Sequence, residues 1–303
     1  MLAAARATSI LPLLCFLVSA PALALPEPQN DIPTIFANAA AGKGPKCSPV
    51  YNDFPGFNLT LAAERDLVPL GPYDAINCGY HIVDLRYGLG SMQRWANLVV
   101  EDAAFGVNSD FGFRSFFKSN NSINAVSSIF RQIAEGAVLP DNECYPNARP
   151  AVFCVNSNDV VPRKLRDVCV ADRTAFFNLD YPHVVMICPR IWGLPDLRER
   201  NVRCPRVGRR GKLTPNNDVI AQNPQALLVH ELVHVYKGTR QRSVEKYQIQ
   251  DAVDLNEADS LWNAASYALY FACESSAFSC ACCLPLFWLL EWMHTKGCRE
   301  AIF

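Results

Sequence analysis

Residues 226–238 read ALLVHELVHVYKG, an apolar run that is interrupted by two histidines and a glutamate. His230 and His234 are four residues apart, so a helix places both imidazoles on one face, one turn from each other. The apolar residues fall toward the other side of that helix and are expected to hold it in the core: Leu227, Leu228, Leu232 and Val233. The stretch therefore predicts a buried helix that presents a histidine pair.

The spacing of His230, Glu231 and His234 is the HExxH pattern. Two imidazoles one turn apart can bind the same zinc ion, and a glutamate that follows the first can act as general base toward water at the metal. With five histidines in the chain, a chance HExxH is expected in on the order of one such sequence in several hundred. The alternative, a core histidine pair satisfied by hydrogen bonds, is the weaker interpretation. The pattern predicts a Zn2+ site with Glu231 as catalytic base.

A catalytic zinc site needs a third protein ligand and an open position for water. No third histidine follows at the HExxHxxGxxH spacing, because Gly238 is followed by Thr239 and Arg240. An acidic ligand is therefore expected from the carboxylates that come next in the chain: Glu245, Asp251, Asp254, Glu257 or Asp259.

Composition and the N-terminus indicate an exported globular protein. Half of the 303 residues are apolar, 19% are charged and the formal net charge is −1, which excludes the disordered and nucleic-acid-binding classes. Residues 1–24 combine an early arginine, the run ILPLLCFLV and small residues, as a secretory signal peptide does. Residues 25–77 are rich in Pro, Gly and Asn and predict a mostly irregular N-terminal extension or pro-segment.

Cysteine usage supports secretion. One of the 13 cysteines lies in the predicted signal peptide, which leaves an even number and predicts a disulfide framework. Spacing favours a local pair between Cys188 and Cys204. Sequons at Asn58 and Asn120 predict a glycoprotein. The Cys-rich, apolar tail 273–303 is expected to form a disulfide knot, with neither a membrane span nor a lipid anchor.

The remaining pattern predicts an α+β domain with a small β-sheet over residues 78–272. Apolar residues recur at helical spacing in 82–104, 123–136, 223–236 and 256–271. Ser122 and Asn256 are expected to cap two of these helices, and Gly136 to end one. The runs AVFCV (151–155) and HVVMIC (183–188) predict strands.

Several segments resemble the deuterolysin, or aspzincin, family of secreted zinc metalloendopeptidases. NAASYALYFA (263–272) is similar to the family's N-A-D-x-Y-A-L-Y-A helix, and ICPRIWGLPDL before Cys204 is similar to the segment that leads to its active site. FRSFFK (113–118) and IFRQIAEGA (129–137) also match in character. The resemblance implies a compact, mainly helical zincin-like metallopeptidase domain, in which two histidines and one aspartate bind zinc.

The family places its aspartate in G-T-x-D-x-x-Y-G, and this chain departs from that pattern. Alignment on NAASYALY places Tyr247 at the family's tyrosine, which is implied to stabilise the oxyanion. The aspartate then falls on Val244, and one deleted residue would bring Glu245 into its place. Glu245 is therefore the expected third ligand, with Asp251 or Asp254 as alternatives.

A second departure concerns specificity. Ala265 stands where the family commonly has an acid, near the pocket that receives basic side chains. The absence of that acid argues against a preference for basic substrates. So does the excess of basic residues around the site: Lys237, Arg240, Arg242 and Lys246. This excess is also expected to lower the pKa of a nearby carboxylate.

The sequence thus predicts a secreted metalloendopeptidase that hydrolyses protein or peptide substrates by a zinc-activated water, with Glu231 as general base. The alternative is a catalytically inactive secreted protein, zinc-binding or host-interacting, that keeps the HExxH helix but has lost the proper third ligand.

Overall fold

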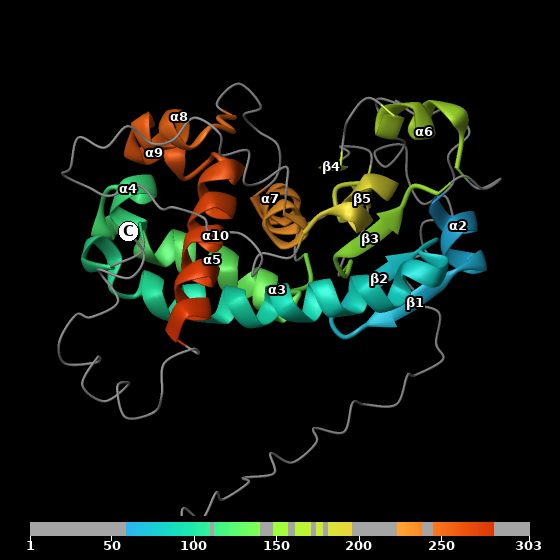
Figure 1. The fold of residues 1–303 in the computed structure, drawn as a ribbon, viewed down its shortest axis with the longest axis horizontal. Coiled ribbons are helices and arrows are strands. Elements are labelled where there is room, and N and C mark those ends of the chain that lie inside the picture. The colour runs from blue at the N-terminus through green and yellow to red at the C-terminus, as the bar shows by residue number, and fades with distance from the viewer. Residues whose placement is uncertain are drawn as a thin grey trace, which may run out of the picture. The chain divides into compact units, whose positions relative to one another are not determined.

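A computed structural model describes most of the predicted domain (Figure 1). The described residues are 59–109, 112–139, 148–156, 161–170, 174–177, 181–195, 223–237 and 245–281. They form one five-stranded sheet and a set of helices, so the predicted α+β class is confirmed. The predicted signal peptide, the sequon at Asn58 and residues 282–303 of the predicted tail 273–303 lie outside these residues.

The sheet has the strand order β1-β2-β3-β5-β4. Its strands are β1 Leu67–Leu70, β2 Tyr73–Ile76, β3 Ala151–Cys154, β4 Ala175–Phe177 and β5 Val184–Ile187. The three central strands run parallel, while β1 and β4 are antiparallel edges. Every residue of β3 and β5 is buried, as expected of parallel strands that are covered on both faces. Both predicted strands are confirmed.

Residues 59–76 do not form the irregular extension that composition predicted. They form the helix α2 (Leu59–Arg65) and the hairpin of β1 and β2, in which Tyr73 and Ile76 are fully buried. The apolar pattern of β2 was hidden by Asp74, which is itself buried and lies 3.4 Å from an Arg149 guanidinium nitrogen. The sheet therefore begins upstream of Cys78, and residues 25–58 lie outside the described part of the chain.

Three of the four predicted helices are confirmed: α3 Ile82–Ala103, α5 Ile123–Glu135 and α7 Pro224–Lys237. The other helices of the described residues are α4 Phe113–Phe117, α6 Arg163–Val170, α8 Ile249–Asp254, α9 Glu257–Ser260 and α10 Ala264–Ala281. Short 3-10 turns are η1 Gly79–His81, η2 Gly106–Asn108, η3 Asn120–Ser122 and η4 Pro189–Gly193. Gly136 ends α5 in the left-handed conformation, as expected. Ser122 precedes α5, but its side chain does not cap the helix. Its hydroxyl lies within hydrogen-bond distance of the Phe117 carbonyl and of Oε1 of Glu257, and its one hydrogen can go to either acceptor.

The single helix predicted at 256–271 is two helices. Asn256 caps the first, α9, by accepting a hydrogen bond from the Asp259 amide. The chain then leaves helical geometry over residues 261–263, and α10 begins at Ala264.

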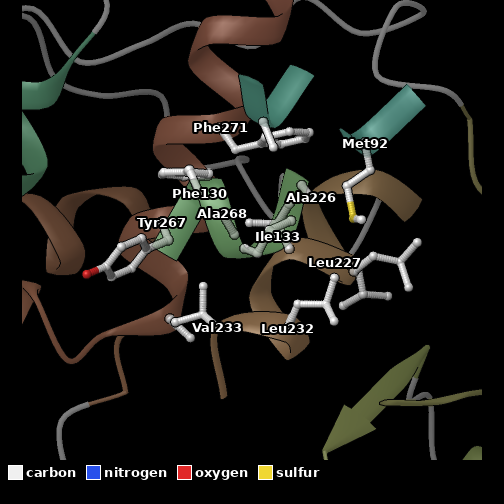
Figure 2. Packing of buried hydrophobic residues seen from close by; sticks show 14 of the residues in the cluster. Met92, Phe130, Ile133, Ala226, Leu227, Leu232, Val233, Tyr267, Ala268 and Phe271 are labelled. Carbon is white, nitrogen blue, oxygen red and sulfur yellow. The ribbon is translucent and has the colours of Figure 1, made fainter. Parts of the chain in front are cut away.

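The helix α7 lies among other elements of the core and contacts α3, α5, α10 and the strands β4 and β5. Figure 2 shows Leu227, Leu232 and Val233 of α7 among side chains of α5 and α10. Burial of these residues confirms that the apolar side of the predicted helix faces the core. The sheet's other face is covered by α2 and α6, through a second cluster that includes Phe153 and Leu165.

Two disulfides join the sheet to its surroundings. Cys78 is bonded to Cys154 at the end of β3, and Cys169 of α6 is bonded to Cys188 at the end of β5. The predicted pair of Cys188 with Cys204 is therefore wrong, because α6 folds over the sheet and brings Cys169 to the end of β5. Within the described part of the chain, no helix is both long and apolar enough to cross a membrane.

Candidate metal centre

The helix α7 fixes the first two candidate ligands. It begins after Asn223, whose side chain accepts a hydrogen bond from the Ala226 amide, with a proline at the first helical position. One helical turn then places the ring centroids of His230 and His234 5.0 Å apart at an angle of 80°. Glu231 lies between them in sequence and is 6% exposed.

Glu245 completes a group of three possible ligands. Its Oε2 atom lies 3.4 Å from Nε2 of His234, and the ligand atoms of His230, His234 and Glu245 all lie within 4.8 Å of one another. Around a tetrahedral zinc with bonds of about 2.1 Å, neighbouring donors stand roughly 3.4 Å apart. The His234–Glu245 pair already has that separation. No other such group of three occurs among the described residues.

Burial sets the protonation of the metal-free group. Removal from water lowers the pKa of His230 to about 3, with a smaller contribution from His234, so its imidazole is neutral and able to bind a metal. Burial raises the pKa of Glu245 to about 7, against the opposing effect of a hydrogen bond from the Ala265 backbone. A cation among these donors would favour the charged carboxylate. The buried Nδ1 atom of His230 has no hydrogen-bond partner among the described residues, which also fits a site that is completed by an ion.

The basic residues do not act as expected on the nearby carboxylate. The pKa of Glu245 is raised rather than lowered, because burial outweighs the hydrogen bond from the Ala265 amide. The Lys237 ammonium is directed to other partners: its Nζ donates to the Leu261 carbonyl and, at 2.9 Å, to the Tyr267 hydroxyl. Lys246 is exposed, and Arg240 and Arg242 lie outside the described residues.

Tyr247 flanks the group on its solvent side. Its side chain is 54% exposed, and its ring centroid lies 5.5 Å from that of His230. The two alternative ligands, Asp251 and Asp254, lie in α8 and are not members of the group. The structure therefore brings together His230, His234 and Glu245, with Tyr247 at the edge.

The start of α10 contributes contacts that the sequence did not indicate. The Ala265 amide donates a hydrogen bond to Oε1 of Glu245 at 3.2 Å, and the side chain of Asn263 bonds the backbone of Lys246. The motif NAASYALY marked this segment only through its resemblance to a family helix, and nothing in the residue types showed that it contacts Glu245.

Comparison with known proteins adds no identity. A search of protein-family models finds no match to the chain, and a search of curated proteins finds none either. The resemblance to aspzincins therefore stays a prediction that is carried by the motifs.

Proposed function

We propose that the protein is a secreted zinc metalloendopeptidase. The observation that carries the proposal is the position of Glu245: a carboxylate from a separate segment lies beside a histidine pair that is set on one face of a helix. A site of two histidines and one glutamate, with the glutamate of HExxH as base, is a donor set of catalytic zinc enzymes.

The group is buried on one side and open on the other. His230 is 3% exposed, whereas the side chain of His234 is 18% exposed and that of Glu245 is 11% exposed. Substrate and water therefore approach past His234, Glu245 and the exposed ring of Tyr247. Bound Zn2+ supplies a Lewis acid that polarises a peptide carbonyl and makes water more acidic.

The chain's own residues then carry the protons and position the substrate. Glu231 accepts a proton from the attacking water and returns it to the leaving amine. The Tyr247 hydroxyl donates a hydrogen bond to the oxygen of the scissile carbonyl as negative charge develops there. Substrates with basic side chains are not preferred, because Ala265 offers no negative charge; cleavage of peptide libraries that favoured Lys or Arg on the primed side would contradict this.

The proposal is tested by measuring the metal content and the peptide hydrolysis of the wild type and of Glu231→Gln. We expect about one zinc per chain in the purified protein, and the analysis should cover iron as well, because iron(II) sites use the same donor set. Glu231→Gln keeps the size of the side chain and is expected to retain zinc while peptide hydrolysis falls by about 10²- to 10⁴-fold.

The same experiment separates the non-catalytic alternative. Stoichiometric zinc with no hydrolysis that depends on Glu231 would favour a zinc-binding or interaction protein and contradict the enzyme. A wild-type protein that takes up no metal after dialysis against Zn2+ would contradict the metal centre itself.

A further inference from the structure

The segment that carries Glu245 is attached to the start of α10 by a buried carboxamide. Asn263 is fully buried, and its Oδ1 accepts a hydrogen bond from the Lys246 amide at 2.9 Å. Its Nδ2 donates to the Lys246 carbonyl at 3.3 Å and to the Ser266 hydroxyl at 2.9 Å. Asn263 therefore binds both backbone polar groups of one residue, as a neighbouring strand would.

The orientation of this carboxamide follows from its partners. A backbone amide only donates and a backbone carbonyl only accepts, so Oδ1 must face the Lys246 amide and Nδ2 its carbonyl. The donor to Ser266 then uses the remaining hydrogen of Nδ2. An isosteric carboxylate would keep the first contact and lose both donors.

Lys246 follows Glu245 directly, so fixing its backbone restricts where the Glu245 side chain begins. The carboxylate is then held at both oxygens. Oε1 accepts from the Ala265 amide in the first turn of α10, where backbone N–H groups favour an anion, and Oε2 lies next to His234.

We infer that Asn263 is a positioning residue of the metal centre: its carboxamide holds the backbone of Lys246 so that Glu245 presents Oε2 to the histidine pair. This inference rests on the proposed metal site and not on the proposed hydrolysis. Outer residues that orient a metal ligand typically change metal affinity by about 10- to 100-fold when they are replaced.

The test is zinc affinity of the full chain, measured by competition with a chromophoric chelator. We expect Asn263→Asp to raise the Kd for Zn2+ by about 10- to 100-fold. The matched control is Asn77→Asp, because Asn77 is also buried and its Nδ2 donates to a backbone carbonyl, that of Cys154 at the end of β3. The control makes the same chemical change at the sheet and should leave the Kd within about threefold.

A double-mutant cycle distinguishes positioning from general destabilisation. If Asn263 acts through Glu245, Asn263→Asp should have little further effect on the Kd in a Glu245→Gln background. Equal weakening in both backgrounds, equal weakening by the Asn77→Asp control, or an unchanged Kd in Asn263→Asp would each overturn the inference.

A milder variant applies if Asn263→Asp does not fold. Ser266→Ala removes only the hydroxyl that accepts from Nδ2 of Asn263. It is expected to raise the Kd by roughly threefold to tenfold, again only when Glu245 is present. A wild-type Kd in Ser266→Ala would then overturn the role of Asn263. Because metal affinity is the readout, the result does not depend on whether the protein hydrolyses peptides.

Discussion

The two oxygens of the Glu245 carboxylate have different partners, and in the proposed metal site this division lets a glutamate take the place that the aspzincin pattern gives to an aspartate. Oε1 accepts from the Ala265 amide while Oε2 lies 3.4 Å from Nε2 of His234. The longer side chain spans the distance from the backbone near α10 to the histidine pair on α7. A shorter acid at the same position would reach only one of the two.

Replacement of Glu245 tests this division. Glu245→Gln keeps the length but removes the charge, and we expect the Kd for Zn2+ to rise by at least about tenfold. Glu245→Asp keeps the charge but shortens the side chain by one methylene, so its affinity should also fall below that of the wild type. Chelator competition measures both, and zinc affinity equal to the wild type in Glu245→Gln would remove Glu245 from the ligand set.

Lys237 makes stability depend on pH in an unusual direction. Burial lowers its pKa to about 8, whereas an unfolded lysine titrates near 10.4. Between these values the unfolded chain binds more protons, so the free energy of unfolding rises with pH. We expect a rise on the order of 1–2 kcal/mol between pH 7 and 10 in metal-free protein. Urea unfolding at several pH values measures it.

The control for this prediction is Lys237→Met, which keeps an unbranched side chain beside Trp262 and Tyr267 without a titrating amine. The free energy of unfolding of the wild type minus that of Lys237→Met should increase as pH rises from 7 to 10, because only the wild type loses a desolvated charge. A difference that is constant from pH 7 to 10 would contradict the lowered pKa.

Among the elements, α7 has two tasks, because the same helix carries the histidine pair and fills the core. Leu232 is fully buried next to Glu231, and its loss should cost about 2–5 kcal/mol in Leu232→Ala through lost burial and the cavity left behind. Val83 of α3, which is 68% exposed, offers a control: Val83→Ala should change stability by less than about 0.5 kcal/mol. Equal effects in urea unfolding would contradict the buried position of this face.

Long elements with a clear apolar period were predictable, and short ones were not. The helices α3, α5 and α7 repeat their apolar residues over several turns, and the strands β3 and β5 are continuous apolar runs. The strand β2 has four residues, and one of them is Asp74, whose burial depends on Arg149 from a distant segment. The pairing of Cys188 likewise depends on where α6 lies, which spacing along the chain does not encode.

Prediction of the candidate site met the same limit, because its residues come from segments that are distant in the chain. His230, Glu231 and His234 follow from one helical turn, so the HExxH pattern predicted their arrangement. Glu245 is held near them by contacts with the start of α10, which Asn263 and Ala265 make. The residue types of Asn263 and Ala265 alone do not indicate that role. The prediction of Glu245 as third ligand therefore depended on a resemblance, and the contacts that hold its carboxylate are visible only in the fold.

The proposed zinc ligands come from two segments of one fold, so we expect zinc binding to stabilise the whole domain. A metal that binds only the folded state adds about 2.7 kcal/mol when its free concentration is 100 times the Kd. For a domain of this size, each kcal/mol shifts Tm by about 2–4 °C, so chelation should lower Tm by roughly 5–10 °C. Differential scanning calorimetry with and without a chelator, without reductant so that disulfides stay intact, measures the shift. His234→Gln should lose most of it, and an equal shift in that variant would mean that the chelator acts elsewhere than on the group of His230, His234 and Glu245.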